Sequence, residues 1–176
     1  LSVGTGLGAG IVLRGELHRG RHGAAGELDL VRGMGVEELD PCARALSDYS
    51  ASQAGTVETA LRAPYEVRDV FAAARADDAL GRLVVAEAAR RIALHIVPLA
   101  AVADVALVVI GGGIGANGDL LLEPIRAILA QRLPYPPRVE VSSLGEAAVL
   151  EGALAVGLRS ALDSVFVNRP RAVRTA

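Results

Sequence analysis

The chain has 176 residues, of which 52% are hydrophobic and only 3% aromatic, and its formal charge is −2. This length is within the range of one domain and allows a substantial core, which Ala, Val, Leu and Ile must build. The charge provides no basic field for nucleic acid, and a single cysteine, Cys42, excludes an intrachain disulfide framework. With no signal pattern and no uninterrupted apolar run of membrane-spanning length, we expect a soluble, cytoplasmic protein without a membrane segment.

The chain opens with two predicted strands separated by a glycine-rich turn, within residues 1–13. Gly4 and Gly6 allow the backbone to turn tightly and to approach a ligand, and the Thr5 hydroxyl can face an anion such as phosphate. The segment is not a Walker loop, because no Gly-Lys-Ser/Thr follows, nor a dinucleotide fingerprint, because a strand comes next. Either it is a phosphate hairpin like that of the actin-like kinases, or its glycines serve turn geometry alone.

After the predicted hairpins, the sequence pattern predicts helices. The pattern predicts two or three short antiparallel strands up to about residue 32, then short helices from residue 36 to 63 and from 65 to 76, with Pro41 opening the first. Asp77 and Asp78 are suitable caps for a long helix to about residue 103, which Pro98 bends. That helix is expected to be the central core helix, to offer a face for self-association, or both.

A second glycine turn follows the next predicted strand. Residues 105–110 form a continuous apolar run that ends in Gly111, Gly112 and Gly113, and a helix capped by Asn117 or Asp119 follows to about residue 133. Ligands bind at strand carboxyl ends in open α/β sheets, although such a turn can also be a tight connection only. We expect this turn and the opening hairpin to flank one nucleotide. A short strand at 138–142 and a last helix after residue 145 complete the pattern.

These segments, taken in order, resemble the ROK family of repressors, uncharacterised reading frames and sugar kinases. Residues 4–10 match the family's phosphate hairpin, residues 23–27 its Ala-Gly-Glu signature, residues 108–113 its adenosine-side turn, and residues 143–148 its closing helix. The resemblance covers the chain up to about residue 164. It implies an α/β fold, the second lobe of an actin-like ATPase (ribonuclease H-like) fold, with a mixed sheet and flanking helices. Residues 165–176 are expected to be a flexible tail.

The family's structural zinc is not expected in this chain. In sugar-binding members a histidine after the Ala-Gly-Glu signature and a cluster of cysteines hold the metal, but here the histidine position is Leu30. The cysteine cluster is reduced to Cys42, with Ala45 and Ser47 near the other positions, and a structural zinc needs four good ligands. His18 and His22 are expected to be solvated loop residues. We therefore predict no metal site.

Glu27 is the candidate for a sugar contact, because the resemblance implies that its carboxylate accepts hydrogen bonds from sugar hydroxyls. Alternatively, Glu27 is an exposed loop carboxylate that makes only a local hydrogen bond within its turn. The glutamate that follows the last zinc cysteine in the kinases has no clear match, and Asp48 is a substitute for it. The family's catalytic aspartate lies upstream of the phosphate hairpin, so we expect no catalytic residue here, and neither the first lobe nor a winged helix within these residues.

Two functions follow from the resemblance. The first is the sugar-sensing and oligomerising part of a ROK transcriptional regulator, with a sugar or sugar-phosphate effector, a homodimer, and DNA bound through a domain outside these residues. The second is part of an ATP-dependent, glucokinase-like sugar kinase, in which Thr5 and Gly6 lie near the transferred phosphate, Gly112 and Gly113 against adenosine, and Mg²⁺ is required. A lobe that only maintains the fold, with neither activity, is a third.

Overall fold

The computed structural model describes residues 1–28 and 39–166 of the chain. It divides into two compact units, the first being Leu1–Ser143 and the second beginning at Leu144. The predictions for Leu30 and for most of the tail lie outside the described residues. In the described part of the chain, no helix is both long and apolar enough to cross a membrane.

Short strands of the first unit combine into a mixed arrangement. β1 pairs antiparallel with β2, β3 pairs antiparallel with β4, and β5 pairs parallel with β6. A parallel bridge between Ser2 and Gly111 continues β1 beside the end of β5, so the order β2-β1-β5-β6 contains both directions. The strands are β1 Ser2–Val3, β2 Leu7–Gly8, β3 Ile11–Leu13, β4 Glu16–His18, β5 Leu107–Ile110 and β6 Arg138–Val141.

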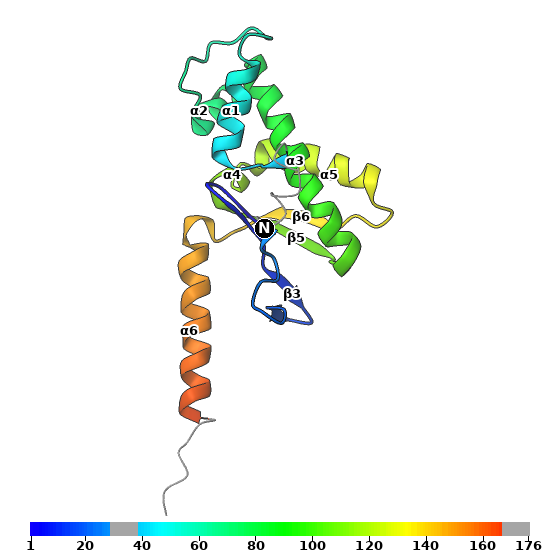
Figure 1. Ribbon diagram of the computed structural model, residues 1–176, viewed down its shortest axis with the longest axis vertical. Helices are drawn as coiled ribbons and strands as arrows, with labels where there is room; N and C mark the ends of the chain where they lie inside the picture. The colour runs from blue at the N-terminus through cyan, green and yellow to red at the C-terminus, as the bar shows by residue number, and fades with distance from the viewer. Residues whose placement is uncertain (29–38, 167–176) are drawn as a thin grey trace, which may run out of the picture. The chain divides into compact units, whose positions relative to one another are not determined.

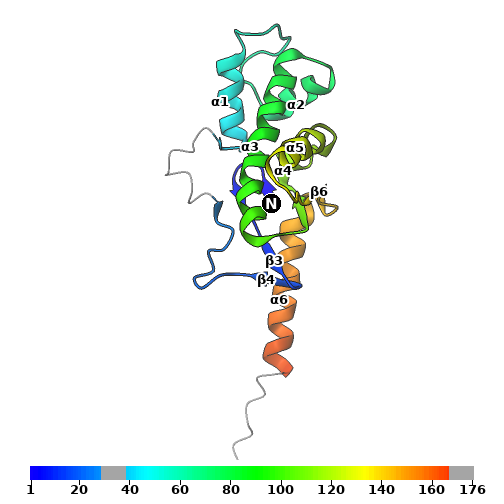
Figure 2. The ribbon, with the colours of Figure 1, turned by 90° about the vertical axis from the view of Figure 1, so that its right-hand side faces the viewer.

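Helices pack around a long central one in the first unit. These are α1 Ala43–Gln53, α2 Val67–Arg75, α3 Ala79–Ala103, the single turn α4 Gly112–Gly115, and α5 Gly118–Arg132. Helices α1, α2 and α5 all contact α3 (Figures 1 and 2). The apolar positions of α3 that recur every three or four residues are fully buried, which confirms it as the central core helix. They are Leu80, Val84, Ala88, Ile92 and Ile96.

The start of α3 confirms the predicted cap. The Asp78 carboxylate accepts a hydrogen bond from the Gly81 amide at 3.0 Å and is the N-cap of the helix. Burial acts to raise the pKa of Asp78, but hydrogen bonds from the Gly81 and Ala60 amides and from the Thr59 hydroxyl outweigh it, so the pKa is lowered. Asp78 therefore fixes both the helix start and the loop that carries Thr59.

The region before α2 differs from the prediction. We expected short helices up to residue 63, but α1 ends at Gln53 and turns occupy residues 54–66. Local polar groups compete for the backbone there: the Thr56 hydroxyl bonds the Gln53 carbonyl, and Thr59 and Ala60 bond Asp78. Pro41 lies before the helix, whose N-cap is Cys42.

The second unit contains the predicted last helix. A 3₁₀ turn at Gly145–Ala147 leads into α6, Ala148–Phe166. Three of its leucines, Leu150, Leu154 and Leu158, recur every four residues and are each 63% exposed.

Candidate functional site

The opening turn is held at the end of β1. The Gly4 amide donates to the Gly6 carbonyl at 3.0 Å, which closes the turn around Thr5. The Val3 amide donates to the Gly111 carbonyl at 2.8 Å, which ties β1 to the second glycine turn. Thr5 and Gly6 are exposed, so the tip of the turn is accessible to a ligand.

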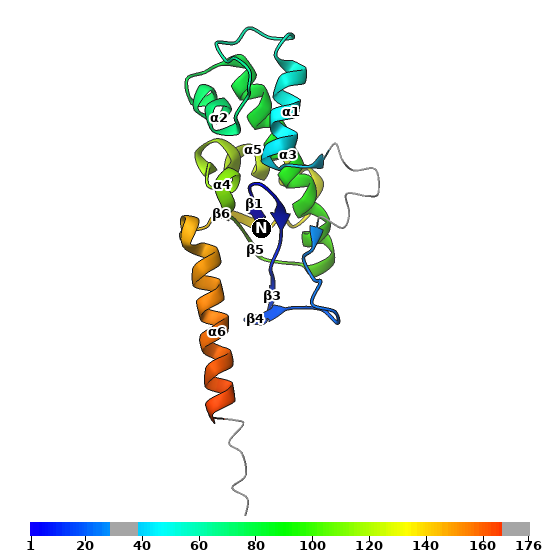
Figure 3. The ribbon, with the colours of Figure 1, turned by 60° about the vertical axis from the view of Figure 1, so that its left-hand side comes forward.

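The second turn lies against the first (Figure 3). Gly112 has φ of +82°, and a Cβ atom there would lie 2.5 Å from the Val3 carbonyl oxygen. Only glycine fits this position, because the backbone conformation and the close approach both exclude a side chain. A Cβ on Gly4 would lie 3.6 Å from the Gly113 amide nitrogen. The structure thus brings Gly4, Gly112 and Gly113 together, with exposed Gly113 beside the opening turn.

The beginning of α1 is attached to the same turn. The Ala43 amide, in the first turn of the helix, donates to the Gly4 carbonyl at 2.9 Å. Immediately before it, the Cys42 amide donates to the Asp40 carboxylate at 2.9 Å, and the Cys42 side chain is buried. Three segments distant in sequence therefore meet at Gly4.

A cluster that sequence reasoning missed stabilises the second turn. The Arg75 guanidinium at the end of α2 donates to both Asp119 carboxylate oxygens, at 2.7 and 2.8 Å, and to the Asn117 side-chain oxygen. Asn117 donates in turn to the Gly113 and Ile114 carbonyls. The hydrogen bond from Arg75 is the main cause that lowers the pKa of Asp119. The only sequence signal was a pair of possible caps, and the side chain of Asn117, at the N-cap of α5, makes no capping bond.

Glu27 lies in a separate turn that is fastened to the chain after β2. Gly26, with φ of +95°, accepts a hydrogen bond from the Ala9 amide at 3.0 Å, and a Cβ there would collide with the Ala9 carbonyl. The Glu27 side chain is exposed, and its amide bonds the Ala24 carbonyl within the turn. The structure anchors Glu27 through the contact between Gly26 and Ala9, in a turn separate from the two glycine turns.

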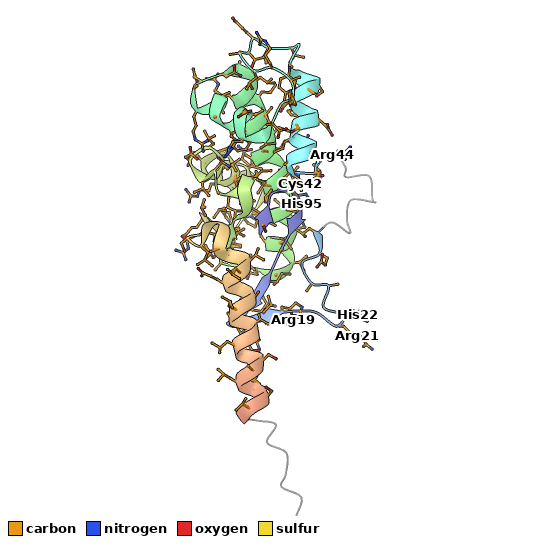
Figure 4. All side chains as sticks on the ribbon, turned by 90° about the vertical axis from the view of Figure 1, so that its left-hand side faces the viewer. Arg19, Arg21, His22, Cys42, Arg44 and His95 are labelled. Carbon is orange, nitrogen blue, oxygen red and sulfur yellow. The ribbon has the colours of Figure 1, made fainter. Side chains whose placement is uncertain are left out.

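The residues at the family's zinc positions do not fit a zinc ion. Cys42 is buried, and the Ser47 hydroxyl donates to the Tyr65 carbonyl at 2.7 Å. The His95 Nε2 atom lies 3.1 Å from the Leu39 carbonyl, whereas His22 is exposed on the loop after β4 (Figure 4). Within residues 1–28 and 39–166, no group of three or more His, Cys, Asp or Glu side chains is arranged to hold a metal.

The paired turns define what this site can do chemically. Residues 4–6 and 111–115 contain a threonine hydroxyl and backbone amides but no ionisable side chain. Amides and a hydroxyl can bind an anion, but they cannot take up a proton from a substrate hydroxyl at neutral pH. These two turns therefore offer groups that can bind an anion, and residues 4–6 and 111–115 themselves contain no catalytic base.

The fold is a mixed α/β fold of the actin-like ATPase type, similar to solved ROK sugar kinases. A ROK family glucokinase from Streptomyces griseus, solved in complex with glucose and AMPPNP, superposes with a TM-score of 0.73 at 27% identity, covering 88% of this chain and 58% of that one. The ROK family model matches residues 1–160. The chain belongs to the ROK family.

Relatives within the family include both enzymes and repressors. The bifunctional enzyme NanE/NanK of Brucella melitensis is 34% identical over 86% of this chain and 29% of its own length. The xylose repressor of Caldicellulosiruptor bescii is 26% identical over 93% of this chain and 46% of its own length. The chain thus spans less than half the length of these two relatives.

Proposed function

We propose that this chain is the sugar-sensing and oligomerising part of a ROK-family transcriptional regulator. The observation that carries the proposal is the loss of most of the family's metal-binding side chains: Cys42 alone remains of the cysteine cluster and is buried, and the Ser47 hydroxyl is engaged with the Tyr65 carbonyl. A sensor tolerates this change more readily than a kinase, because it needs to bind a sugar but not to orient it for reaction. Similarity to the xylose repressor supports the same class.

In this proposal Glu27 accepts hydrogen bonds from sugar hydroxyls. Its side chain is exposed, and Gly26 holds its turn against Ala9, so the carboxylate projects from an anchored segment. The paired glycine turns would bind the phosphate of a sugar-phosphate effector through Thr5 and neighbouring amides. Ligand binding would shift the population between two arrangements of the whole protein. Its DNA contact would come from a domain outside these residues, with a homodimer matching paired operator half-sites, in the cytoplasm.

The sugar contact is tested by titration calorimetry of the intact protein with glucose, xylose and their phosphate esters. Glu27→Gln should weaken binding about 10- to 100-fold, because hydrogen bonds to a charged group contribute roughly 1.5–3 kcal/mol. Glu58→Gln is the matched control, since Glu58 is also an exposed glutamate but lies in the loop before α2. Equal sugar affinities of the two variants would show that Glu27 does not contact the sugar. Binding of the intact protein to operator DNA that does not change with sugar would overturn the proposed sensor function.

The alternative function is an ATP-dependent sugar kinase, which the contact between the two glycine turns favours. In it, Thr5 and Gly6 would lie near the transferred phosphate, Gly112 and Gly113 would face adenosine, and Mg²⁺ would neutralise the developing charge. A Cβ on Gly6 or on Gly113 would have no atom within 4 Å, so alanine fits both positions without disturbing the fold.

Alanine at these two positions separates the alternatives. If the turns bind nucleotide, Gly6→Ala and Gly113→Ala should each weaken MgATP binding to the intact protein about tenfold, because a methyl group would occupy the ligand's side of the turn. A coupled assay for ADP release with glucose measures the kinase directly. Glucose phosphorylation would decide for the kinase, and sugar binding without MgATP binding would decide for the regulator.

A further inference from the structure

Arg75, at the end of α2, is held in a fixed orientation near the second glycine turn. Its Nε and Nη2 atoms donate to the two oxygens of the Asp119 carboxylate, at 2.7 and 2.8 Å. The same Nη2 atom donates to the side-chain oxygen of Asn117 at 2.9 Å. The end of α2 and the beginning of α5 therefore meet at this arginine, close to α4 (Figures 2 and 3). A guanidinium that pairs with both oxygens of one carboxylate is fixed in its plane as well as in its position.

Asn117 connects this arginine to the turn itself. Its Nδ2 atom donates to the carbonyls of Gly113 and Ile114, at 3.0 and 2.9 Å. The Arg75 guanidinium can only donate hydrogen bonds, and the two carbonyls can only accept them. The reverse orientation of the Asn117 amide would place its oxygen against the carbonyls and its NH₂ group against the guanidinium. Arg75 therefore fixes the direction in which the Asn117 amide faces the turn.

The second glycine turn depends on such support because it has little regular structure of its own. The helix α4 within it has four residues, and the carbonyls at the end of a helix have no partners inside that helix. Residues 111–113 are consecutive glycines, which have wide backbone freedom. The Val3 amide holds the Gly111 carbonyl at the beginning of the turn, and Asn117 holds the carbonyls that follow. The exposed Gly113 lies between these two supports.

The charge of Arg75 is already matched by Asp119. The hydrogen bond between the two side chains raises the pKa of Arg75 and lowers the pKa of Asp119, so both groups stay charged near neutral pH. Both side chains are partly exposed, and an ion pair of this kind contributes little to the stability of a fold. What the arginine contributes is therefore the orientation of Asn117 rather than a free positive charge or a large share of stability.

We propose that Arg75 is a positioning residue for the second glycine turn: acting through Asn117, it sets the affinity of this turn for a phosphate-bearing ligand. The inference rests on the proposed function, in which the paired glycine turns bind a sugar phosphate or, in the alternative, MgATP. Backbone groups of the turn bind such a ligand only when they are aligned with it, because hydrogen bonds weaken steeply with misalignment. Arg75 keeps that alignment without touching the ligand.

Titration calorimetry of the intact protein with MgATP and, separately, with glucose 6-phosphate tests this role and distinguishes the two phosphate sources. Arg75→Lys retains the charge but replaces the planar fork with a point charge, so it cannot hold Asp119 and Asn117 in the same geometry. It should weaken binding of the ligand that the wild type binds about fivefold, which corresponds to one net hydrogen bond. Arg82→Ala is the matched control, because Arg82 is an exposed arginine that pairs with Asp77 at 2.6 Å. It should change the affinity by less than about twofold.

A double-variant cycle distinguishes positioning from a general structural effect. Asn117→Asp can still accept a hydrogen bond from Arg75, but it cannot donate to the carbonyls of Gly113 and Ile114. If Arg75 acts through Asn117, Arg75→Lys should weaken binding no further when it is combined with Asn117→Asp. The urea midpoint of Arg75→Lys should stay near that of the wild type, since the ion pair is partly exposed.

Three results would overturn the positioning role and leave the proposed function in place. They are wild-type affinity of Arg75→Lys, an equal loss of affinity in Arg82→Ala, and losses from Arg75→Lys and Asn117→Asp that multiply in the double variant. If the wild-type protein bound neither ligand, the phosphate-binding part of the proposed function would be wrong, and this inference would be wrong with it.

Discussion

Gly112→Ala should destabilise the chain strongly, because Gly112 is where the two glycine turns meet. Its φ of +82° costs a residue with a side chain about 1–2 kcal/mol. The added Cβ would also lie 2.5 Å from the Val3 carbonyl oxygen, and relieving such a clash in packed structure costs about 1–3 kcal/mol. Together these terms predict a loss of roughly 3 kcal/mol in the free energy of unfolding.

Gly113→Ala is the matched control one residue further on. There an added Cβ has no atom within 4 Å, and alanine is favoured over glycine within a helix by roughly 0.5–1 kcal/mol. Urea unfolding followed by circular dichroism measures both variants, with the midpoint compared at constant m-value. If the unfolding free energies of the two variants lay within 1 kcal/mol of each other, the close contact between the turns would be refuted.

Polar contacts of the first unit give three further predictions. Glu87→Ala should cost about 3 kcal/mol, because Arg91 is buried and its guanidinium bonds Glu87 at 2.7 Å; urea unfolding checks this, and a loss below 1 kcal/mol would contradict it. Asp78→Ala should lower stability by about 1–2 kcal/mol through loss of the α3 cap, measured by thermal unfolding, and an unchanged midpoint would exclude that role. Arg75→Ala should cost at most about 1 kcal/mol near pH 7, because the ion pair is partly exposed. The pKa of Asp119 is lowered in the folded chain, so the ion pair contributes to stability above the unfolded pKa of about 4, and this contribution is lost as the pH falls through the folded pKa. The unfolding free energies of wild type and variant should therefore converge in acid. A difference between them that stays constant with pH would rule out the ion pair.

Much of the local structure was predictable from the sequence because it depends on neighbours along the chain. Apolar residues at helical spacing and the Asp78 cap predicted α3, and the apolar run before Gly111 predicted β5. The prediction for the stretch between α1 and α2 was wrong, because contacts beyond the helical pattern decide the structure there. Its periodicity suggested a helix, but polar side chains bond the backbone locally and to Asp78, which lies far along the chain.

The sequence by itself determined the two glycine turns and the order of elements that identifies the family, since both are properties of contiguous residues. Only the tertiary structure decided that Gly112 lies against Val3, that Arg75 bonds Asp119, and that Gly26 anchors the turn of Glu27. These contacts join residues that are distant along the chain, and neither periodicity nor local spacing encodes which distant partners meet. They form because helix packing around α3 and strand register bring the turns to one place, where close backbone approach leaves room for glycine alone.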